Sequence, residues 1–428
     1  MSADIAVVGA GLAGLTAAND LVDAGHRVTV FERAESPGGR AASTMHGPYR
    51  FNRGPHALYR SGEAATVLAD LGVTYTGHVP IQATPKALHR SRIHRLPAGP
   101  GALLRTSLLS PRSKLAVAML LPRLARLAPG AVGLTVDEWV DARTDDPALA
   151  GLLHGLFRLT GYANAPDVTD AGAALEQLAA GVSSGVVYLD GGWQALADGL
   201  AGRATGAGAR IERATVTDLG SVKDAFDGIV LAVGGPAITA RTAGAVDRAD
   251  ALVAAAGPAV EAAVLELGVT QVPATRFILG IDEALYGSVH SPPTDLAPAG
   301  HAVVCLARYL RPGEQHDAEE TRAELTDLAH RMGVAPGHIA AERYLHRMTV
   351  TNGVPLATGS GFAGRPDVDC LGDPQVMVAG DWVGPSGLLA DASVASGRRA
   401  ARALAANLSE ATPSSGAASR RPQVVGEG

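Results

Sequence analysis

The sequence predicts an α/β fold in which one domain is assembled from separated segments and a second, α+β domain is inserted between them. Three observations support this prediction. An apolar strand, a glycine turn and a helix open the chain at residues 4–24. A further strand and a long helix follow only at residues 376–408, and strand-like runs fill residues 259–310. The 428 residues are also enough for two or three domains.

The opening segment has the pattern of a Rossmann-like nucleotide-binding unit. Ile5–Val8 is an apolar run typical of a buried parallel strand, and Gly9, Gly11 and Gly14 follow with the spacing G-x-G-x-x-G. Gly9 permits a tight turn, Gly11 lets the backbone approach a pyrophosphate, and Gly14 lets the next helix pack closely. That helix, predicted over residues 12–24, directs its free N–H groups at the phosphates.

A second strand, predicted over residues 27–32, places Glu32 at its end, where a carboxylate can accept hydrogen bonds from ribose hydroxyls. The glycine spacing recurs at Gly359, Gly361 and Gly364. No apolar strand precedes this second copy, and the proline-containing segment after it cannot form a helix. We therefore expect the second copy to be a loop.

Composition narrows the class of protein. A hydrophobic fraction of 47% with 18% charged residues indicates a well-buried globular chain. The net charge of −6 argues against a nucleic-acid partner. Cys305 and Cys370 are too few for a disulfide framework or a metal site. Neither a secretory signal nor a membrane-spanning run is evident, so we expect a cytoplasmic protein.

The segment after Glu32 carries a specific resemblance. Arg33 opens the run R-A-E-S-P-G-G-R, which ends with Gly38, Gly39 and Arg40; Gly54 follows in G-P-H. With the opening glycine motif, this pattern resembles the superfamily of flavin amine oxidases, protoporphyrinogen oxidases and phytoene desaturases, and phytoene-desaturase-like members most. The resemblance implies an FAD-dependent oxidoreductase with non-covalent FAD in the glycine turn.

The resemblance also gives the C-terminal segment a role. The strand V-M-V-A-G ends at Gly380, next to Asp381, and the final helix begins near Leu388 and Leu389. By resemblance, the Gly–Asp pair contacts the ribityl-phosphate part of FAD and the start of the helix faces the flavin ring. Val216, in a strand predicted over residues 210–219, matches a family valine whose backbone touches the adenine.

The domain boundaries follow from these segments. We expect the FAD-binding domain to comprise residues 1–75, 185–240 and 365–408. The substrate-binding domain should comprise residues 76–184, which are mostly helical, and residues 241–364. Residues 409–428 are rich in Ser, Gly and Pro and are predicted to form a disordered tail.

The expected reaction is dehydrogenation or desaturation of a largely apolar small molecule. Residues 259–281 lack the lysine that flavin amine oxidases commonly place near the ring, and Arg276 is the only cation there. Two alternatives stay open: an amine or amino-acid oxidase that produces hydrogen peroxide, and a non-redox FAD-dependent isomerase. The electron acceptor is open between dioxygen and a quinone.

Three residues are candidates for the chemistry itself. His56 follows Gly54-Pro55 in a segment that, by resemblance, passes the flavin, where an imidazole of near-neutral pKa could shuttle a proton. A structural role for His56 beside the cofactor is equally open. Trp382 could lie on the ring, line the cavity or pack in the core. Arg276 is the weakest candidate, as a polar group of the substrate domain.

Residues 101–134 bear on whether the protein contacts a membrane. They combine an apolar stripe, Leu115, Met119 and Leu120, with basic residues that include Arg112, Lys114, Arg123 and Arg126. A helix of this kind can lie on a membrane surface, but the same pattern describes a helix whose apolar face packs on the core. We favour the core interpretation and keep peripheral membrane contact as the alternative.

Overall fold

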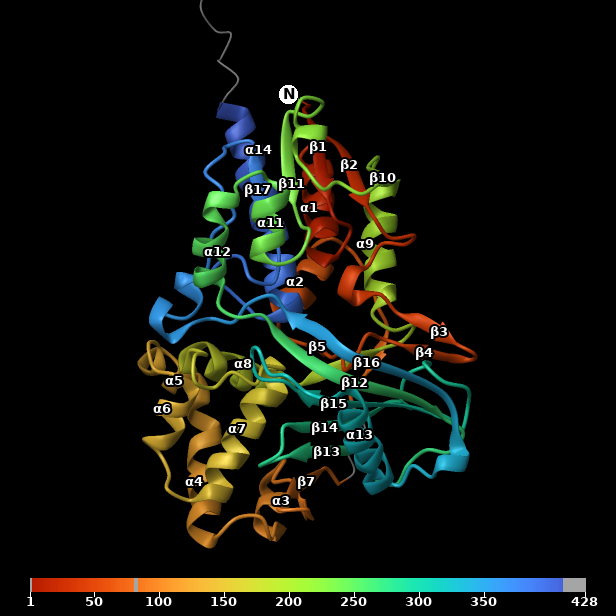
Figure 1. Cartoon of the computed structure of the whole chain (residues 1–428), viewed down its shortest axis with the longest axis vertical. Helices are drawn as coiled ribbons and strands as arrows, with labels where there is room; N and C mark the ends of the chain where they lie inside the picture. The colour runs from red at the N-terminus through yellow and green to blue at the C-terminus, as the bar shows by residue number, and fades with distance from the viewer. Residues whose placement is uncertain (1, 81–83, 411–428) are drawn as a thin grey trace, which may run out of the picture.

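The computed structural model describes residues 2–80 and 84–410, which form two lobes (Figure 1). The upper lobe is built on a parallel sheet of order β10-β2-β1-β11-β17. Its strands are β1 (Asp4–Val8), β2 (Arg27–Glu32), β10 (Arg210–Arg213), β11 (Gly228–Leu231) and β17 (Val376–Val378).

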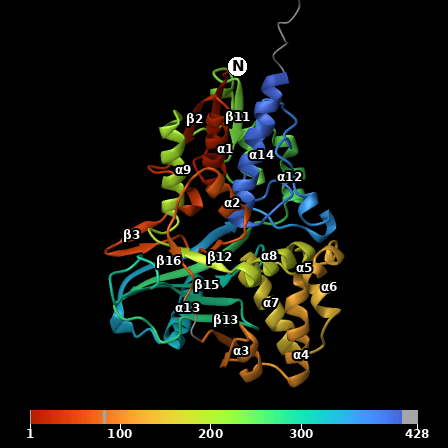
Figure 2. The ribbon, with the colours of Figure 1, turned by 180° about the vertical axis from the view of Figure 1, so that it is seen from behind.

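Helices cover both faces of the parallel sheet, which is why its strands are short, continuous apolar runs. Figure 2 shows α1 (Leu12–Asp23), α9 (Gln194–Gly206) and α14 (Leu389–Glu410) side by side, with α1 in the middle. The helices α11 (Pro236–Thr242) and α12 (Ala249–Ala256) pack against the same hydrophobic cluster. This lobe therefore extends along the chain to about residue 256, beyond the boundary predicted at 240.

The lower lobe contains a seven-stranded sheet of order β16-β12-β15-β14-β13-β7-β8. Its strands are β7 (Lys86–His89), β8 (Arg92–Arg95), β12 (Val260–Val269), β13 (Phe277–Gly280), β14 (Leu285–Ser291), β15 (Ala302–Tyr309) and β16 (Ile339–Thr351). The helix α13 (Ala318–Met332) packs on one face and the helical region on the other. Because both faces are covered, β12 is buried at nearly every position. The strands predicted within residues 259–310 are confirmed.

The predicted helical region is confirmed as well. It comprises α3 (Pro100–Arg105), α4 (Pro111–Leu120), α5 (Leu124–Leu127), α6 (Val136–Asp141), α7 (Pro147–Gly161) and α8 (Ala171–Ser184). Leu120 packs against the core, but the side chains of Leu115 and Met119 are 60% and 49% exposed. The core interpretation of the apolar stripe is therefore wrong for these two residues, because α4 buries its other face through Val117.

Short elements complete the fold: β3 (Thr44–His46), β4 (Tyr49–Phe51), β5 (Leu58–Tyr59), β6 (Gly77–His78), β9 (Val186–Leu189), α2 (Glu63–Asp70) and α10 (Gly220–Lys223). The strand predicted over residues 210–219 ends at Arg213. The second glycine copy forms two short 3-10 turns, Ala357–Gly359 and Phe362–Gly364, which confirms the loop.

The predicted tail begins inside a helix, because α14 continues to Glu410. The rest of that prediction, residues 411–428, lies outside the described residues. Within residues 2–80 and 84–410, no helix is both long and apolar enough to cross a membrane.

Candidate functional site

A cavity of about 680 Å³ runs between the two lobes. At one end it reaches Gly9 and Gly11, at the carboxyl end of β1. At the other end it reaches Ala262 of β12 and Ala307 and Tyr309 of β15, on the seven-stranded sheet. The cavity thus joins the predicted nucleotide turn to the inserted domain.

Close contacts between main-chain atoms determine the shape of the glycine turn. Gly9 has a φ of +104°, which favours glycine, and its N–H donates to the Phe31 carbonyl over 2.8 Å. A Cβ on Gly14 would lie 1.9 Å from the Gly9 carbonyl oxygen, so only glycine lets α1 pack this closely. A Cβ on Gly11 would meet no protein atom within 4 Å and would instead enter the cavity.

Glu32 ties this turn to the following loop. Its carboxylate accepts a hydrogen bond from the Ala10 N–H and another from the Ala34 N–H, each over 2.8 Å. The Gly38 N–H donates to the Ala10 carbonyl over 2.8 Å. Glu32 also lines the cavity, as do Arg33, Gly38, Gly39 and Val216.

An ion pair joins the N-terminal and C-terminal segments. The Arg40 Nη1 lies 2.7 Å from Oδ2 of Asp381 and also donates to the Val350 carbonyl over 2.8 Å. Asp381 further accepts hydrogen bonds from the Asn352 N–H and side-chain amide. Burial would raise the pKa of Asp381, but Arg40 and these donors lower it to about 2. Both members of the pair line the cavity, beside Gly380.

The start of α14 faces the same cavity. Leu388 and Leu389 line it, and Leu389 has a φ of +56°, an uncommon conformation for a side chain of this size. Asp391, in the first turn of the helix, is 7% exposed and accepts a hydrogen bond from the Ala64 N–H over 2.8 Å. Burial raises the pKa of Asp391 to about 6.

His56 lies in the cavity wall, but as a neutral imidazole. Its Nδ1 lies 3.0 Å from the Gly54 carbonyl oxygen, and its ring centre lies 4.9 Å from that of Trp193. Burial lowers the pKa of His56 to about 4, so the near-neutral pKa predicted from sequence is wrong. Gly54 does not line the cavity; its φ of +89° forms the turn before His56.

Two of the three predicted catalytic candidates lie elsewhere. Trp382 is fully buried in the core of the upper lobe, and its Nε1–H donates to the Gly234 carbonyl over 2.7 Å. Arg276 precedes β13 and is not part of the described cavity wall. Trp382 is therefore a packing residue, and neither side chain is placed to touch a ligand in this cavity.

Sequence reasoning missed most of the far end of the cavity. Tyr59, Tyr162 and Tyr309 line it, and the ring centres of Tyr162 and Tyr309 lie 6.2 Å apart. We call this far end of the cavity the chamber. Its wall also includes Trp193, Ala262, Ala307, Met348, Leu388 and Leu389. Trp193 directly follows a glycine pair, residues 191–192, which is a signal that could have found it; aromatic residues make up only 4% of the chain.

The residues present fit FAD. The helix α1 begins after Gly11, which has no side chain to cap it, so its first N–H groups are free for phosphates. The open space at Gly11 leaves room for a pyrophosphate. In the chamber, Trp193 Nε1 and the Tyr309 hydroxyl are buried without a hydrogen-bond partner among the described residues. Such orphaned groups are expected where a ligand completes the site.

Comparisons with known proteins agree with this geometry. A family described as NAD(P)-binding Rossmann-like domain matches residues 7–71. The phytoene dehydrogenase of Streptomyces griseus is 56% identical over 54 residues, 13% of this chain and 11% of that protein. Protoporphyrinogen oxidase 2 of Arabidopsis thaliana is 35% identical over 112 residues, 26% of this chain and 22% of that protein. The predicted superfamily resemblance is confirmed.

Solved structures extend the likeness to the whole fold. Cyclohexylamine oxidase from Brevibacterium oxydans has a TM-score of 0.66 at 16% identity, covering 96% of this chain and all of that one. UDP-galactopyranose mutase has a TM-score of 0.68 at 14% identity, and the match covers 95% of this chain and 97% of that one. The α/β fold with a Rossmann-like domain is thereby confirmed. The sequence matches span less than a quarter of the curated relatives just named.

Proposed function

We propose that this chain is an FAD-dependent oxidoreductase that removes hydrogen from a largely apolar small molecule. One observation carries the proposal: a single cavity joins the glycine turn to the chamber. FAD is long enough to need both ends, and when bound it supplies the hydride acceptor. The relatives named phytoene dehydrogenase and protoporphyrinogen oxidase support this class of reaction.

We assign the cofactor to the residues that line or shape the cavity. In this assignment the first turn of α1 binds the pyrophosphate, Glu32 binds the ribose and Val216 lies at the adenine. The start of α14 faces the ring, where the positive end of a helix dipole stabilises negative charge. The other members of the set are Gly9, Gly11, Gly14, Arg33, Gly38, Gly39, Arg40, Gly54, Gly380 and Asp381.

The chamber supports an apolar substrate. Alanine, leucine and methionine side chains form much of its wall, and its tyrosines contribute aromatic rings. His56 is neutral at physiological pH, so it brings no charge to this wall. A chamber of this kind acts mainly by excluding water and by aligning a C–H bond, which contributes through proximity and orientation.

The test is the visible spectrum of the purified protein, followed by anaerobic photoreduction and then by admission of air. We expect a yellow, non-covalently bound flavin that is released on denaturation and reoxidises slowly, as in a dehydrogenase that passes electrons to a quinone. A colourless protein that cannot take up FAD would refute the proposal.

The same experiment discriminates two alternatives. An amine or amino-acid oxidase is favoured by the tyrosines Tyr59, Tyr162 and Tyr309, which could surround an amine. Reoxidation within seconds, with formation of peroxide, would support that oxidase. A non-redox isomerase would instead convert its substrate with no net electron transfer.

We also propose that α3 and α4 make peripheral contact with a membrane. Leu104, Leu115 and Met119 are 76%, 60% and 49% exposed, within a segment that also carries Arg112 and Lys114. Exposed apolar and basic side chains on one segment are typical of binding to anionic lipid. Flotation with anionic vesicles should carry the wild-type chain upward and leave a Leu115→Ser/Met119→Ser double variant behind. A wild-type chain that never floats would remove this proposal.

A further inference from the structure

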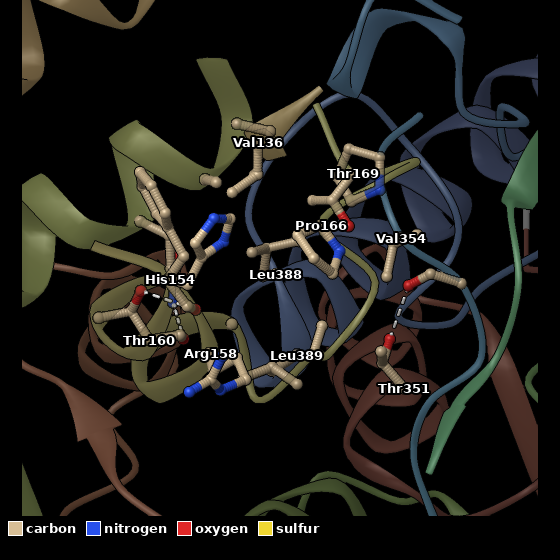
Figure 3. Close-up of a pocket in the computed structure, with 18 residues that line it drawn as sticks. Val136, His154, Arg158, Thr160, Pro166, Thr169, Thr351, Val354, Leu388 and Leu389 are labelled. Atoms are coloured by element: carbon tan, nitrogen blue, oxygen red, sulfur yellow. Dashed lines mark hydrogen bonds between the residues drawn. The ribbon is translucent and has the colours of Figure 1, made fainter. Parts of the chain in front are cut away.

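A second, smaller cavity adjoins the chamber, and we call it the annex. It lies between α7, the segment 351–355 and the start of α14 (Figure 3). Leu388 and Leu389 line both the annex and the chamber. The annex has a volume of about 40 Å³. One buried water needs roughly 10–15 Å³, so the annex has room for a group of about three heavy atoms.

Arg158 of α7 is the charged side chain of most interest in this wall. It is 9% exposed, and its Nη2 donates to the carbonyls of Gly280 and Ile281, each over 3.1 Å. The Nε–H of the same guanidinium is buried and has no acceptor among residues 2–80 and 84–410. A guanidinium retains its charge in proteins, so Arg158 presents a desolvated cation with an unfilled donor.

The remaining wall does not neutralise this cation. The described lining residues of the annex include no aspartate or glutamate. His154, one turn before Arg158 on the same face of α7, also lines the annex, and its Nε2 lies 3.6 Å from Asp137. The pKa of His154 is lowered, chiefly by burial. Arg158 is therefore the one fixed charge in the described wall of the annex.

We infer that the annex binds a carboxylate of the substrate through Arg158, while the apolar remainder of the substrate lies in the chamber. A carboxylate has three heavy atoms and matches the planar donors of a guanidinium. The two cavities adjoin at Leu388 and Leu389, which line both of them, so one substrate can reach from the annex into the chamber. The inference rests on the proposed function and makes its substrate class an apolar monocarboxylic acid.

The test uses the FAD-loaded protein and two matched series of compounds. One series consists of phenylalkanoates of increasing chain length, and the other of the corresponding neutral amides; both are followed by the change in the flavin absorption band. For the best-fitting chain length we expect the carboxylate to bind about tenfold or more tightly than its amide, because a charge-assisted hydrogen bond replaces an orphaned donor.

Variants locate the effect. Arg158→Met should abolish the preference for the carboxylate but retain the affinity for the amide, and Arg158→Lys should retain part of the preference. Arg402→Met, which removes an exposed arginine of α14, is the matched control and should behave as wild type. Arg158 also holds the turn after β13, so circular dichroism and flavin content are recorded for each variant.

Two outcomes would overturn the inference: equal affinities for carboxylate and amide at every chain length, or a preference that survives in Arg158→Met. If Arg158→Met does not fold, the wild-type comparison and Arg158→Lys still decide. A wild-type chain that takes up no flavin would instead be a failure of the proposed function, and it is recognised before any compound is added.

Discussion

The two ends of the main cavity are lined by different parts of the chain, one by main-chain atoms and the other by side chains. The nucleotide end is mostly backbone, and its glycines Gly9, Gly11 and Gly38 come from one stretch of the chain. The chamber is mostly side chains, and Tyr59, Tyr309 and its other wall residues come from segments scattered along the chain. Substitutions at the first end should therefore act through space and main-chain geometry, and those at the second through the contacts of single side chains.

The largest effect is expected at Gly14. In Gly14→Val the new Cβ would overlap the Gly9 carbonyl oxygen at 1.9 Å, and main chain cannot yield as a flexible side chain can. We expect a loss of at least about 3 kcal/mol in the free energy of unfolding, a large fraction of the total stability of a domain. Circular dichroism and chemical denaturation measure it. A stable Gly14→Val chain would contradict the close packing of α1.

Gly11→Val should separate binding from folding. Its side chain enters the cavity and meets no protein atom, so we expect a folded chain that retains almost no flavin. The ratio of flavin to protein absorbance measures the loss. The second glycine copy offers no clean control, because Gly361 has a φ of +65° and its Cβ would lie 2.6 Å from Asp170. Gly337→Val, at an exposed position with open space, is the control and should retain full flavin content.

A substitution of Asp381 tests the ion pair with Arg40 that links the N-terminal and C-terminal segments at the cavity. Asp381→Ala leaves Arg40 and Asn352 without their shared acceptor. Breaking a fully buried pair costs about 3–5 kcal/mol, and the loss here should be about 2–3 kcal/mol because the Arg40 side chain is 38% exposed. Flavin should also dissociate more readily during dialysis. Unchanged stability and flavin content in this variant would show that the pair does not join the two segments.

Asp391 gives a pH dependence of defined sign. Its folded-state pKa of about 6 exceeds its ordinary value of 3.8, so the folded chain keeps a proton that the unfolded chain has released. The free energy of unfolding should therefore fall as pH rises through this window, by about 1 kcal/mol from about pH 5 to about pH 7. Asp391→Asn should lose this contribution while keeping an acceptor for the Ala64 N–H. Thermal unfolding at both pH values measures it, and identical pH profiles would contradict the assignment.

The smallest effect is expected in the chamber. The Tyr309 hydroxyl is buried without a partner among the described residues. Tyr309→Phe removes this unsatisfied group and should change the free energy of unfolding by less than about 1 kcal/mol, with full flavin content. Chemical denaturation measures the difference. A large loss would show that the hydroxyl has a structural partner, and the contrast between the two ends would then weaken.

The same contrast explains what the sequence could predict. The segment from Asp4 to Glu32 folds as expected because its turn chemistry and apolar runs are contiguous. Trp382 is adjacent to Asp381, yet one faces the core and the other the cavity, and the sequence does not say in which direction a residue after a strand points. In the sequence Tyr309 looks like an ordinary core residue, and Arg158 looks like an ordinary surface residue. Only the fold shows which buried donors are left without a partner.

The most direct test of the account is equilibrium binding of FAD, FMN and ADP to the cofactor-free chain. If the cavity holds one molecule at both ends, FAD should bind about a hundredfold or more tightly than either FMN or ADP, because the two linked parts bind together. An affinity for ADP equal to that for FAD would mean that only the glycine turn takes part in binding. It would contradict the claim that the turn and the chamber form one site.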